Sequence, residues 1–373
     1  MKRVLYFLVQ PIDSRPPCVA EVCMLRDMGI EVVLLTTGCN GPTRKLLEEK
    51  GVSVELFEMK QFPVMVLQRG INAVNYYQVF RRFWKKYWTD ESVVWVGSEQ
   101  SVIKMWCYLR NHHPIILNAL EFYDEAWYQK GMRKIVPKVE ILTACEPTRA
   151  QYMVDWWNLK KTPYILRNKP YGGVPPKGTG STPKLQEAIQ LLQGKKVLLY
   201  QGSISADRDL GLLAHALAAG KSDFYLVLSG PDKDGGLDQL RAIYDKVLYL
   251  GNFPAPTHLE ITPYATACVA FYKDNCINNR YCAPNKIYEY AGCGAPMLCN
   301  AIPGLTETVG KAGAAECVDF EDSQAVLAAL SRIGDHYEAY HQAALDFYNQ
   351  TDNTDVMKQI VADAFSRIKE SEV

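Results

Sequence analysis

The stretch Ala283–Leu298, APNKIYEYAGCGAPML, decides the fold of this chain. It lies just downstream of an apolar run at 267–272, ACVAFY, which predicts a buried strand that enters a polar loop. Pro284 sits where a helix can begin, because its missing N–H costs nothing there. Gly292 and Gly294 predict the end of that helix, and the apolar residues after them predict the next strand. Strand, loop, helix and strand in this order indicate an α/β unit.

Two charged residues lie on the predicted helix. Lys286 and Glu289 are three positions apart, so they share one face. The N–H groups of a helix start and a lysine suit phosphate, and a carboxylate suits ribose hydroxyls. The alternative is an ordinary α/β unit with a surface ion pair. This stretch alone does not decide between the two.

The rest of the chain repeats the strand–helix rhythm in two series. Short apolar strands that alternate with helices predict parallel sheets covered on both faces. In the first series we expect strands at 4–9, 31–36, 52–57, 93–96, 114–118 and 141–144, with helices at 19–28, 45–50 and 146–157. In the second we expect strands at 196–200, 224–229, 247–250, 268–272 and 296–300, with helices at 210–219, 237–244, 258–264, 322–333, 337–349 and 352–370.

A segment rich in proline and glycine separates the two series. Residues 167–180, RNKPYGGVPPKGTG, have no apolar period and predict a linker or hinge. We therefore expect an α/β chain of two Rossmann-like, doubly wound domains that face each other across a cleft, with ligands at the carboxyl ends of the strands. The expected parts are an N-terminal domain at 1–168, a linker at 169–195, a C-terminal domain at 196–350 and a last helix at 351–373 that returns to the first domain.

Composition excludes several classes of protein. The 373 residues carry no net charge, but residues 1–170 hold 24 Lys+Arg against 17 Asp+Glu, and the remainder reverses this balance. A basic first half suits an anionic partner or a membrane surface. The 11 cysteines are odd in number and form no CxxC pair, so they predict buried thiols in a reducing compartment rather than a disulfide framework. The histidines and carboxylates show no metal-ligand spacing, so we expect no metal site and no protein-bound cofactor.

The N-terminal sequence and the hydropathy lead to an expected location. The opening MKRVLYFLV resembles the start of a signal peptide, but its apolar run is short and ends at Pro11, so it predicts a first strand. No stretch approaches the roughly 20 apolar residues of a membrane span. We expect a cytoplasmic protein.

Several segments of the second half resemble the GT-B glycosyltransferases, in particular the group 1, family-4-like enzymes that use nucleotide sugars in bacterial polysaccharide and glycan assembly. The resemblance covers about residues 196–350 in its order of elements. It is carried by LLYQGSISADRDLGLLAHAL, YLVLSGP, VLYLGNFP, ACVAFY and PNKIYEYAGCGAPML. Such enzymes show a glycine after the first strand of this domain and a basic residue before the next helix, which Gly202 and Arg208 match. Glu289 matches their ribose-binding glutamate, and Gly294 begins the Gly-x-Pro turn that follows it.

The sequence also departs from the pattern of these enzymes. Many carry a second glutamate eight residues before the ribose-binding one, where this chain has Tyr281. Many carry two cations near the first strand, whereas Ser203 occupies the earlier position and leaves Arg208 alone, with Lys286 as a source of the second charge. These departures leave the donor sugar and the stereochemical outcome open.

The resemblance implies a binding site for a nucleoside diphosphate sugar. Negative charge grows on the leaving diphosphate during transfer, so cations and a helix start are the expected response. We expect Arg208 and Lys286 to stabilise the diphosphate and Glu289 to bind the ribose. The remaining expected nucleotide contacts are Gly202, Ser203, Ser229, Gly230, Pro284 and Asn285.

The first half is expected to bind the acceptor. Glu121, Asp124 and Glu125 follow the strand at 114–118, and Asp13, Ser14 and Arg15 follow the first strand. If transfer inverts the configuration, Glu121 or Asp13 would act as general base. If it proceeds with retention by a same-face route, no such base is needed.

One further segment suggests where the acceptor lies. Arg81–Trp88, RRFWKKYW, interleaves four cations with aromatic residues, a combination suited to the lipid headgroup layer. The alternative is that the rings pack inward and the cations remain solvated. Nucleic acid is not an expected partner, because no binding motif accompanies the patch.

We therefore expect a glycosyltransferase that moves a sugar from a UDP- or GDP-linked donor to a saccharide or lipid-linked saccharide on the cytoplasmic side of a membrane. The resemblance implies retention of configuration. A GT-B-fold sugar-nucleotide epimerase would share the nucleotide pocket, and it would alter the donor without an acceptor. A catalytically silent scaffold would keep the fold and bind no nucleotide.

Overall fold

The computed structural model describes residues 2–58, 65–205, 210–233 and 235–370. The chain folds into two compact units. Unit 1 comprises residues 1–171 together with 352–373, and unit 2 comprises residues 172–351. Unit 1 is thus built from both ends of the sequence.

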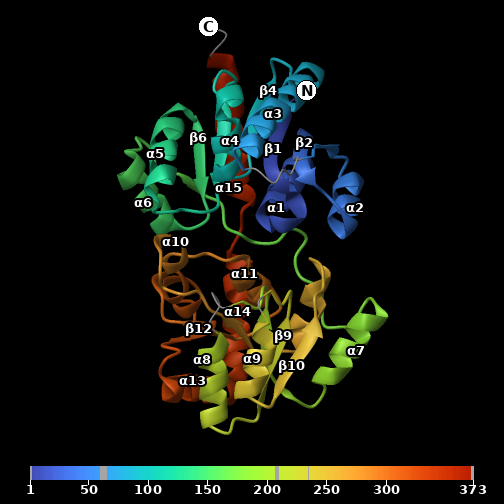
Figure 1. Ribbon diagram of the computed structural model, residues 1–373, viewed down its shortest axis with the longest axis vertical. Coiled ribbons are helices and arrows are strands. Elements are labelled where there is room, and N and C mark those ends of the chain that lie inside the picture. Colours follow the sequence, from blue (N-terminus) through green and yellow to red (C-terminus); the bar gives the residue numbers. More distant parts are fainter. Residues whose placement is uncertain (1, 59–64, 206–209, 234, 371–373) are drawn as a thin grey trace. The chain divides into compact units, whose positions relative to one another are not determined.

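Unit 1 is an α/β layer structure around a seven-stranded sheet (Figure 1). The strands run parallel in the order β3-β2-β1-β4-β5-β6-β7. They are β1 (Arg3–Pro11), β2 (Glu31–Gly38), β3 (Ser53–Leu56), β4 (Ser92–Val96), β5 (Ile115–Ala119), β6 (Ile141–Ala144) and β7 (Tyr164–Ile165).

Helices cover the unit 1 sheet. They are α1 (Pro16–Asp27), α2 (Gly41–Glu49), α3 (Met65–Tyr87), α4 (Glu99–Leu109), α5 (Ala126–Ile135), α6 (Pro147–Trp157) and α15 (Thr354–Glu370). The last of these packs against α1, and Met357, Ile360 and Ala364 on it are fully buried in the core of unit 1.

The central strands of unit 1 are apolar on both faces because helices cover both faces. Every residue of β4 and of β5 is buried. In register, Tyr6 of β1 lies opposite Trp95 of β4, and the two rings stack with centroids 6.1 Å apart. This buried centre holds the strand ends, and hence the loops that follow them, in place.

Unit 2 contains a second parallel sheet of six strands. Its order is β10-β9-β8-β11-β12-β13. The strands are β8 (Lys196–Gln201), β9 (Phe224–Ser229), β10 (Val247–Gly251), β11 (Ala267–Ala270), β12 (Met297–Asn300) and β13 (Ala315–Val318). The helices are α7 (Pro183–Leu192), α8 (Leu210–Ala219), α9 (Gly236–Ile243), α10 (Ile277–Arg280), α11 (Asn285–Gly292), α12 (Pro303–Leu305), α13 (Ser323–Asp335) and α14 (Tyr337–Gln350).

The structure differs from the sequence expectation within 169–195, where we expected only a linker. Residues 183–192 form helix α7, and its side chains Leu185, Ala188 and Leu192 belong to the core of unit 2. The Thr182 hydroxyl accepts the Leu185 N–H and caps the start, with Pro183 in the first turn. The apolar residues of α7 recur at helical spacing, so they form one face that packs into the core of unit 2.

A second difference lies at 258–264, where we expected one helix. The structure has two short 3-10 segments, at Thr257–Glu260 and Thr262–Tyr264. Pro263 falls inside this range and cannot donate the N–H that a continuous helix needs.

The aromatic residues of Arg81–Trp88 pack largely inward. Phe83 is buried, and the Trp84 ring centroid lies 4.0 Å from that of Trp88 and 3.7 Å from that of His112. The four cations of the segment are exposed. No helix in the described residues is both long and apolar enough to cross a bilayer.

Candidate active site

The strand order of unit 2 defines where a ligand would bind. From β8, the chain first builds outward through β9 and β10, and then returns to the other side of β8 with β11. In open parallel sheets, ligands bind outside the carboxyl ends of the strands at such a reversal. The loops after β8 and β11 therefore frame the candidate site.

The first part of this site is a pair of glycine turns. The Gly202 N–H donates to the Ser229 carbonyl (2.8 Å), and the Gly230 N–H donates to the Gly251 carbonyl (3.0 Å). Both Gly202 and Gly230 have positive φ angles, 143° and 142°. A Cβ at Gly230 would lie 2.0 Å from the Gly202 carbonyl oxygen. Only glycine permits this approach, so the loops after β8 and β9 form one compact floor.

The second part is the start of α11, the helix that the sequence predicted. Pro284 is its N-cap residue in an extended conformation, and no side-chain hydrogen bond caps the start. Gly294, with φ 64°, follows its end. The positive end of the helix dipole at Asn285 and Lys286 thus faces the carboxyl edge of the sheet, where anions are favoured.

Lys286 lies at the strand reversal itself. Its Nζ is 4.0 Å from the centroid of the Tyr200 ring and 5.7 Å from that of the Tyr272 ring, at the ends of β8 and β11. The same Nζ would be 3.0 Å from a Cβ on Gly202. The Tyr200 hydroxyl donates to the Ser203 carbonyl (3.0 Å). One half-buried cation is therefore directed onto the glycine floor by two aromatic rings.

The third part is an acid–imidazole pair. Glu289, one turn further along α11, is 8% exposed, and its Oε2 lies 3.6 Å from Nε2 of His258. Nδ1 of His258 is buried and has no hydrogen-bond partner among the described residues. The Gln201 side-chain amide donates to the His258 carbonyl (2.7 Å) and accepts a hydrogen bond from the Thr262 hydroxyl (2.9 Å).

His258 is a residue that the sequence analysis missed. The sequence did contain a signal for it. Prolines at 254, 256 and 263 are incompatible with one continuous helix, so His258 was to be expected in the irregular segment after β10. Arg208, the other expected cation, lies outside the described residues.

The loops of unit 1 that follow β1 and β5 bring together only some of the predicted acceptor residues. Arg15 Nη1 lies 3.6 Å from Glu121 Oε1. Asp13 instead accepts the Asn40 N–H (3.1 and 3.2 Å), and Ser14 donates to the Pro11 carbonyl (2.7 Å).

Asp124 and Glu125 are exposed. Glu125 is the N-cap residue of α5, but its side chain makes no capping hydrogen bond. In the described residues, no ion pair joins either carboxylate to Arg15.

A buried carboxylate lies beside this group, and the sequence analysis did not select it. Glu99 begins α4 directly after β4, which is where the strand order of unit 1 reverses. It is fully buried, its Oε2 accepts the Glu121 N–H (3.4 Å), and its Oε1 has no partner in the described part of the chain. Burial, aided by the negative charge of Glu121, raises the pKa of Glu99 to about 7. A carboxyl group with such a pKa can exchange protons at neutral pH.

Deeper in unit 1, Glu21 is a structural buried acid. Its Oε2 accepts the Tyr6 hydroxyl (2.6 Å) and its Oε1 accepts the Asn118 amide, which in turn accepts the Thr143 hydroxyl (2.9 Å). Burial raises the pKa of Glu21 to about 8, and the hydrogen bond from Tyr6 only partly opposes this shift.

This raised pKa makes the stability of unit 1 depend on pH. The unfolded carboxyl loses its proton near 4.5, whereas the folded one keeps it up to about 8, so stability falls as pH rises through that window. We expect Glu21→Gln to reduce the difference in urea midpoint between about pH 5 and about pH 8. Glu49→Gln, at an exposed acid of α2, should leave the pH dependence of the wild type unchanged. An unaltered pH dependence in Glu21→Gln would contradict the assignment.

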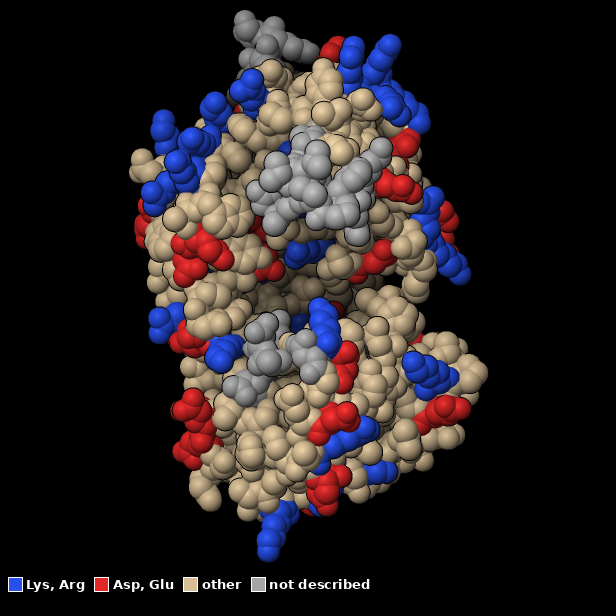
Figure 2. Space-filling model, in the orientation of Figure 1, with Lys and Arg blue, Asp and Glu red and all other residues tan. Residues whose placement is uncertain are grey.

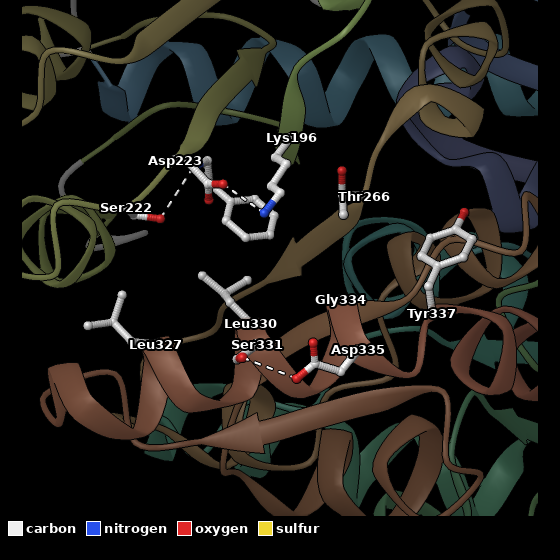
Figure 3. A pocket seen from close by; sticks show the side chains of 11 residues that line it. Lys196, Ser222, Asp223, Thr266, Leu327, Leu330, Ser331, Gly334, Asp335 and Tyr337 are labelled. Atoms are coloured by element: carbon white, nitrogen blue, oxygen red, sulfur yellow. Dashed lines mark hydrogen bonds and ion pairs between the residues drawn. The ribbon is translucent and has the colours of Figure 1, made fainter.

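A cavity at the opposite edge of the unit 2 sheet has none of these features (Figure 3). It has a volume of about 520 Å³ and lies where β8 and β9 begin. In it, the Lys196 amine forms an ion pair with the Asp223 carboxylate (2.7 Å), and the Ser331 hydroxyl donates a hydrogen bond to Asp335 (3.3 Å). Its lysine is paired with Asp223 and the cavity lies at the amino ends of the strands, so it is not part of the candidate site. In the described residues, no group of three or more His, Cys, Asp or Glu side chains could hold a metal ion.

Comparison with solved structures identifies the fold. The chain superposes on a sucrose-phosphate synthase from Thermosynechococcus elongatus with a TM-score of 0.72, at 13% identity over 100% of both chains. It superposes on Anabaena HepE in complex with UDP-glucose with a TM-score of 0.70, at 13% identity over 98% of this chain and 100% of that one. For a glycosyltransferase from Rickettsia africae the TM-score is 0.69, at 14% identity over 98% of each chain.

The chain has the GT-B fold. No family model matches the sequence, and no curated protein matches it significantly. The expected fold class, α/β with two Rossmann-like doubly wound sheets, is confirmed. In this GT-B chain, the candidate site of unit 2 and the buried acid Glu99 of unit 1 each lie at the reversal point of their own sheet.

Proposed function

We propose that this protein is a glycosyltransferase that moves a sugar from a nucleoside diphosphate sugar to a saccharide or lipid-linked saccharide, with retention of configuration. The observation that supports this function best is the placement of Lys286 between Tyr200 and Tyr272 at the strand reversal of unit 2, above the glycine floor. Similar structures carry bound UDP or UDP-glucose. We expect UDP as the donor nucleotide, with GDP as the second candidate.

In this proposal, unit 2 binds the donor. Lys286 and the start of α11 receive the diphosphate, whose negative charge grows as the bond to the sugar breaks. Arg208 supplies a second cation. Glu289 accepts hydrogen bonds from the ribose hydroxyls. The nucleotide pocket is lined by Gly202, Ser203, Ser229, Gly230, Pro284 and Asn285.

Unit 1 receives the acceptor in the same proposal. Arg15 and Glu121, which pair with each other, bind acceptor hydroxyls together with Ser14, Asp124 and Glu125. Glu121 or Asp13 would serve as the base if transfer inverted configuration. The carboxylate of Glu99 accepts the backbone N–H of Glu121, so we assign Glu99 as a positioning residue for the loop after β5.

A nucleotide screen tests the donor assignment. Ligand that binds the folded state raises the melting temperature by mass action. We expect UDP to raise it most, GDP less, and CMP and ADP least. A protein that no nucleoside diphosphate stabilises would be the catalytically silent scaffold. Conversion of the UDP-sugar without an acceptor, to a different UDP-sugar, would identify an epimerase instead.

The role of Glu289 gives a more specific prediction. In Glu289→Gln, one carboxylate oxygen that accepts hydrogen bonds becomes an amide donor. We expect UDP to bind about 10- to 100-fold more weakly, since a hydrogen bond to a charged group contributes about 1.5–3 kcal/mol. Binding of UDP and of 2′,3′-dideoxy-UDP, measured by calorimetry, checks this directly.

The wild type should distinguish these two nucleotides, and Glu289→Gln should distinguish them much less. Glu187→Gln, at an exposed acid of α7, serves as the control and should bind both as the wild type does. Equal discrimination in Glu289→Gln and the wild type would remove Glu289 from the ribose site.

We propose a cytoplasmic location with peripheral contact to the inner face of the membrane. The sequence predicted that Arg81–Trp88 makes this contact. The structure weakens that assignment, because the segment keeps its exposed cations but turns its rings inward. Nucleic acid is not among the proposed partners.

A further inference from the structure

A second basic surface of unit 1 has no part in the proposed transfer reaction. Residues 126–138 form α5 and the 3-10 turn Val136–Lys138, and they contain four cations and no acid. Lys130, Lys134 and Lys138 are exposed, whereas the apolar side of α5 is buried against the core. This helix is therefore anchored on one side and basic on the other.

Two further lysines extend this basic surface. Lys160 and Lys161 are exposed in the turn after α6. A groove of about 480 Å³ is lined by Pro137 and Lys138 on one side and by the segment 158–163 on the other, so the two basic segments are neighbours. Figure 2 shows Lys and Arg side chains gathered along the upper left edge, over α5, with Asp and Glu side chains just below them.

Two of the acids near this surface, Glu140 and Asp363, are engaged with other groups. Glu140 pairs with His113 (2.9 Å) and accepts the Ile115 N–H (2.7 Å). Asp363 of α15 pairs with Arg367 (2.9 Å). In the described part of the chain, no ion pair joins a carboxylate to any of the five exposed lysines at 130, 134, 138, 160 and 161. The surface therefore carries unneutralised positive charge.

One large aromatic side chain stands on the same helix face. Trp127 is 67% exposed. The structure describes all seven tryptophans, and the other six are buried or partly buried. Trp127, Lys130 and Lys134 are three and four residues apart, so they share a face of α5. An indole at the boundary of a basic helix face is typical of proteins that rest in the lipid headgroup layer.

We propose that the face formed by Trp127, Lys130, Lys134, Lys138, Lys160 and Lys161 docks onto a bilayer that contains anionic lipids. The charge complements lipid phosphates, and the indole inserts at the boundary with the acyl chains. The segment Arg81–Trp88 offers cations without an exposed ring, because Trp84 and Trp88 pack against each other and against His112. This proposal does not depend on the transferase activity.

Sedimentation of the full chain with vesicles tests the proposal. We expect binding to vesicles of phosphatidylcholine mixed with phosphatidylglycerol, and little binding to phosphatidylcholine alone. The variant Lys130→Gln/Lys134→Gln should lower the partition coefficient about 30-fold, given the usual contribution of each lysine near an anionic surface. The matched control, Arg81→Gln/Lys85→Gln, removes two exposed cations from α3 and should bind as the wild type does.

The tryptophan is tested separately. Trp127→Ala should lower binding even at high salt, where the contribution of charge is screened. Leu191→Ala, at another exposed apolar side chain (52%) in unit 2, is the control and should have no effect. Melting curves of each variant confirm that it folds.

Three results would overturn the proposal. One is equal loss of binding in the α5 and α3 double variants, which would mean that binding follows net charge alone. Another is loss only in the α3 variant, which would place the docking surface at Arg81–Trp88. The last is tight binding to a soluble polyanion such as dextran sulfate with none to anionic vesicles, which would identify a soluble acidic partner.

Discussion

Lys286→Ala should abolish most nucleotide-dependent activity and leave the fold intact. The Nζ of Lys286 lies at the strand reversal of unit 2, held between the rings of Tyr200 and Tyr272. Removing one preorganised charge that stabilises a developing anion lowers kcat roughly 100- to 1,000-fold. The measurement is the turnover of a sugar donor that carries the nucleotide selected by the thermal screen, together with binding of that nucleotide by calorimetry.

The chain provides a matched control for this variant. Lys195 also lies over an aromatic ring, with its Nζ 5.4 Å from the Tyr225 centroid, but at the opposite edge of the same sheet. Lys195→Ala should therefore leave both UDP binding and turnover unchanged. Lys286→Arg keeps the charge and should retain more activity than Lys286→Ala. Wild-type UDP binding in Lys286→Ala would remove the central support for a donor site in unit 2.

Gly230→Ala is expected to destabilise unit 2 severely. The φ of Gly230 is 142°, a value that residues with a side chain rarely adopt, and the new Cβ would lie 2.0 Å from the Gly202 oxygen. The contact is with backbone rather than with a flexible side chain, so the loops after β8 and β9 must separate. We expect a loss of about 3 kcal/mol or more in the free energy of unfolding, measured by urea denaturation.

Gly194→Ala separates the effect of crowding from that of φ alone. Gly194 also has a positive φ, 70°, but nothing lies within 4 Å of its Cβ position. Its substitution should cost about 1 kcal/mol. UDP should stabilise Gly194→Ala as it does the wild type, whereas any folded Gly230→Ala should have lost that response. Similar stabilities for the two variants would contradict the close approach of the two loops.

Much of the fold was predictable because its signals are local. Pro284, Gly292 and Gly294 marked the bounds of α11, and the structure places that helix at Asn285–Gly292. Glu146–Trp157 was likewise expected as a helix, and α6 runs from Pro147 to Trp157. Continuous apolar runs identified the buried strands, since parallel strands covered on both faces need no alternation.

The parts that were missed depend on tertiary contacts. Glu21 and Glu99 look like ordinary helix carboxylates in the sequence, and only the packing of β1, β4 and β5 around them reveals that they are buried. His258 becomes notable because Glu289 lies 3.6 Å away, although the two are 31 positions apart. Spacing along a chain carries no such information.

The sequence also could not decide which basic segment presents an aromatic ring to solvent. Arg81–Trp88 has the denser mixture of cations and rings, yet Trp84 stacks on Trp88 and packs against His112. Trp127 has fewer cations around it in the sequence, and it is the exposed one. The direction of each ring follows from the neighbouring helix that covers it, which the composition of a segment does not specify.

The assembly of unit 1 from both ends of the sequence constrains how the protein can fold during synthesis. The surface of α1 that receives Met357, Ile360 and Ala364 remains uncovered on the ribosome until residues 352–373 emerge. Unit 2 is contiguous, so its whole sequence is available earlier, and domains generally fold as units while translation proceeds. Premature termination within the last helix would therefore leave a folded unit 2 attached to a unit 1 with an open apolar core, a nascent chain prone to aggregation and degradation.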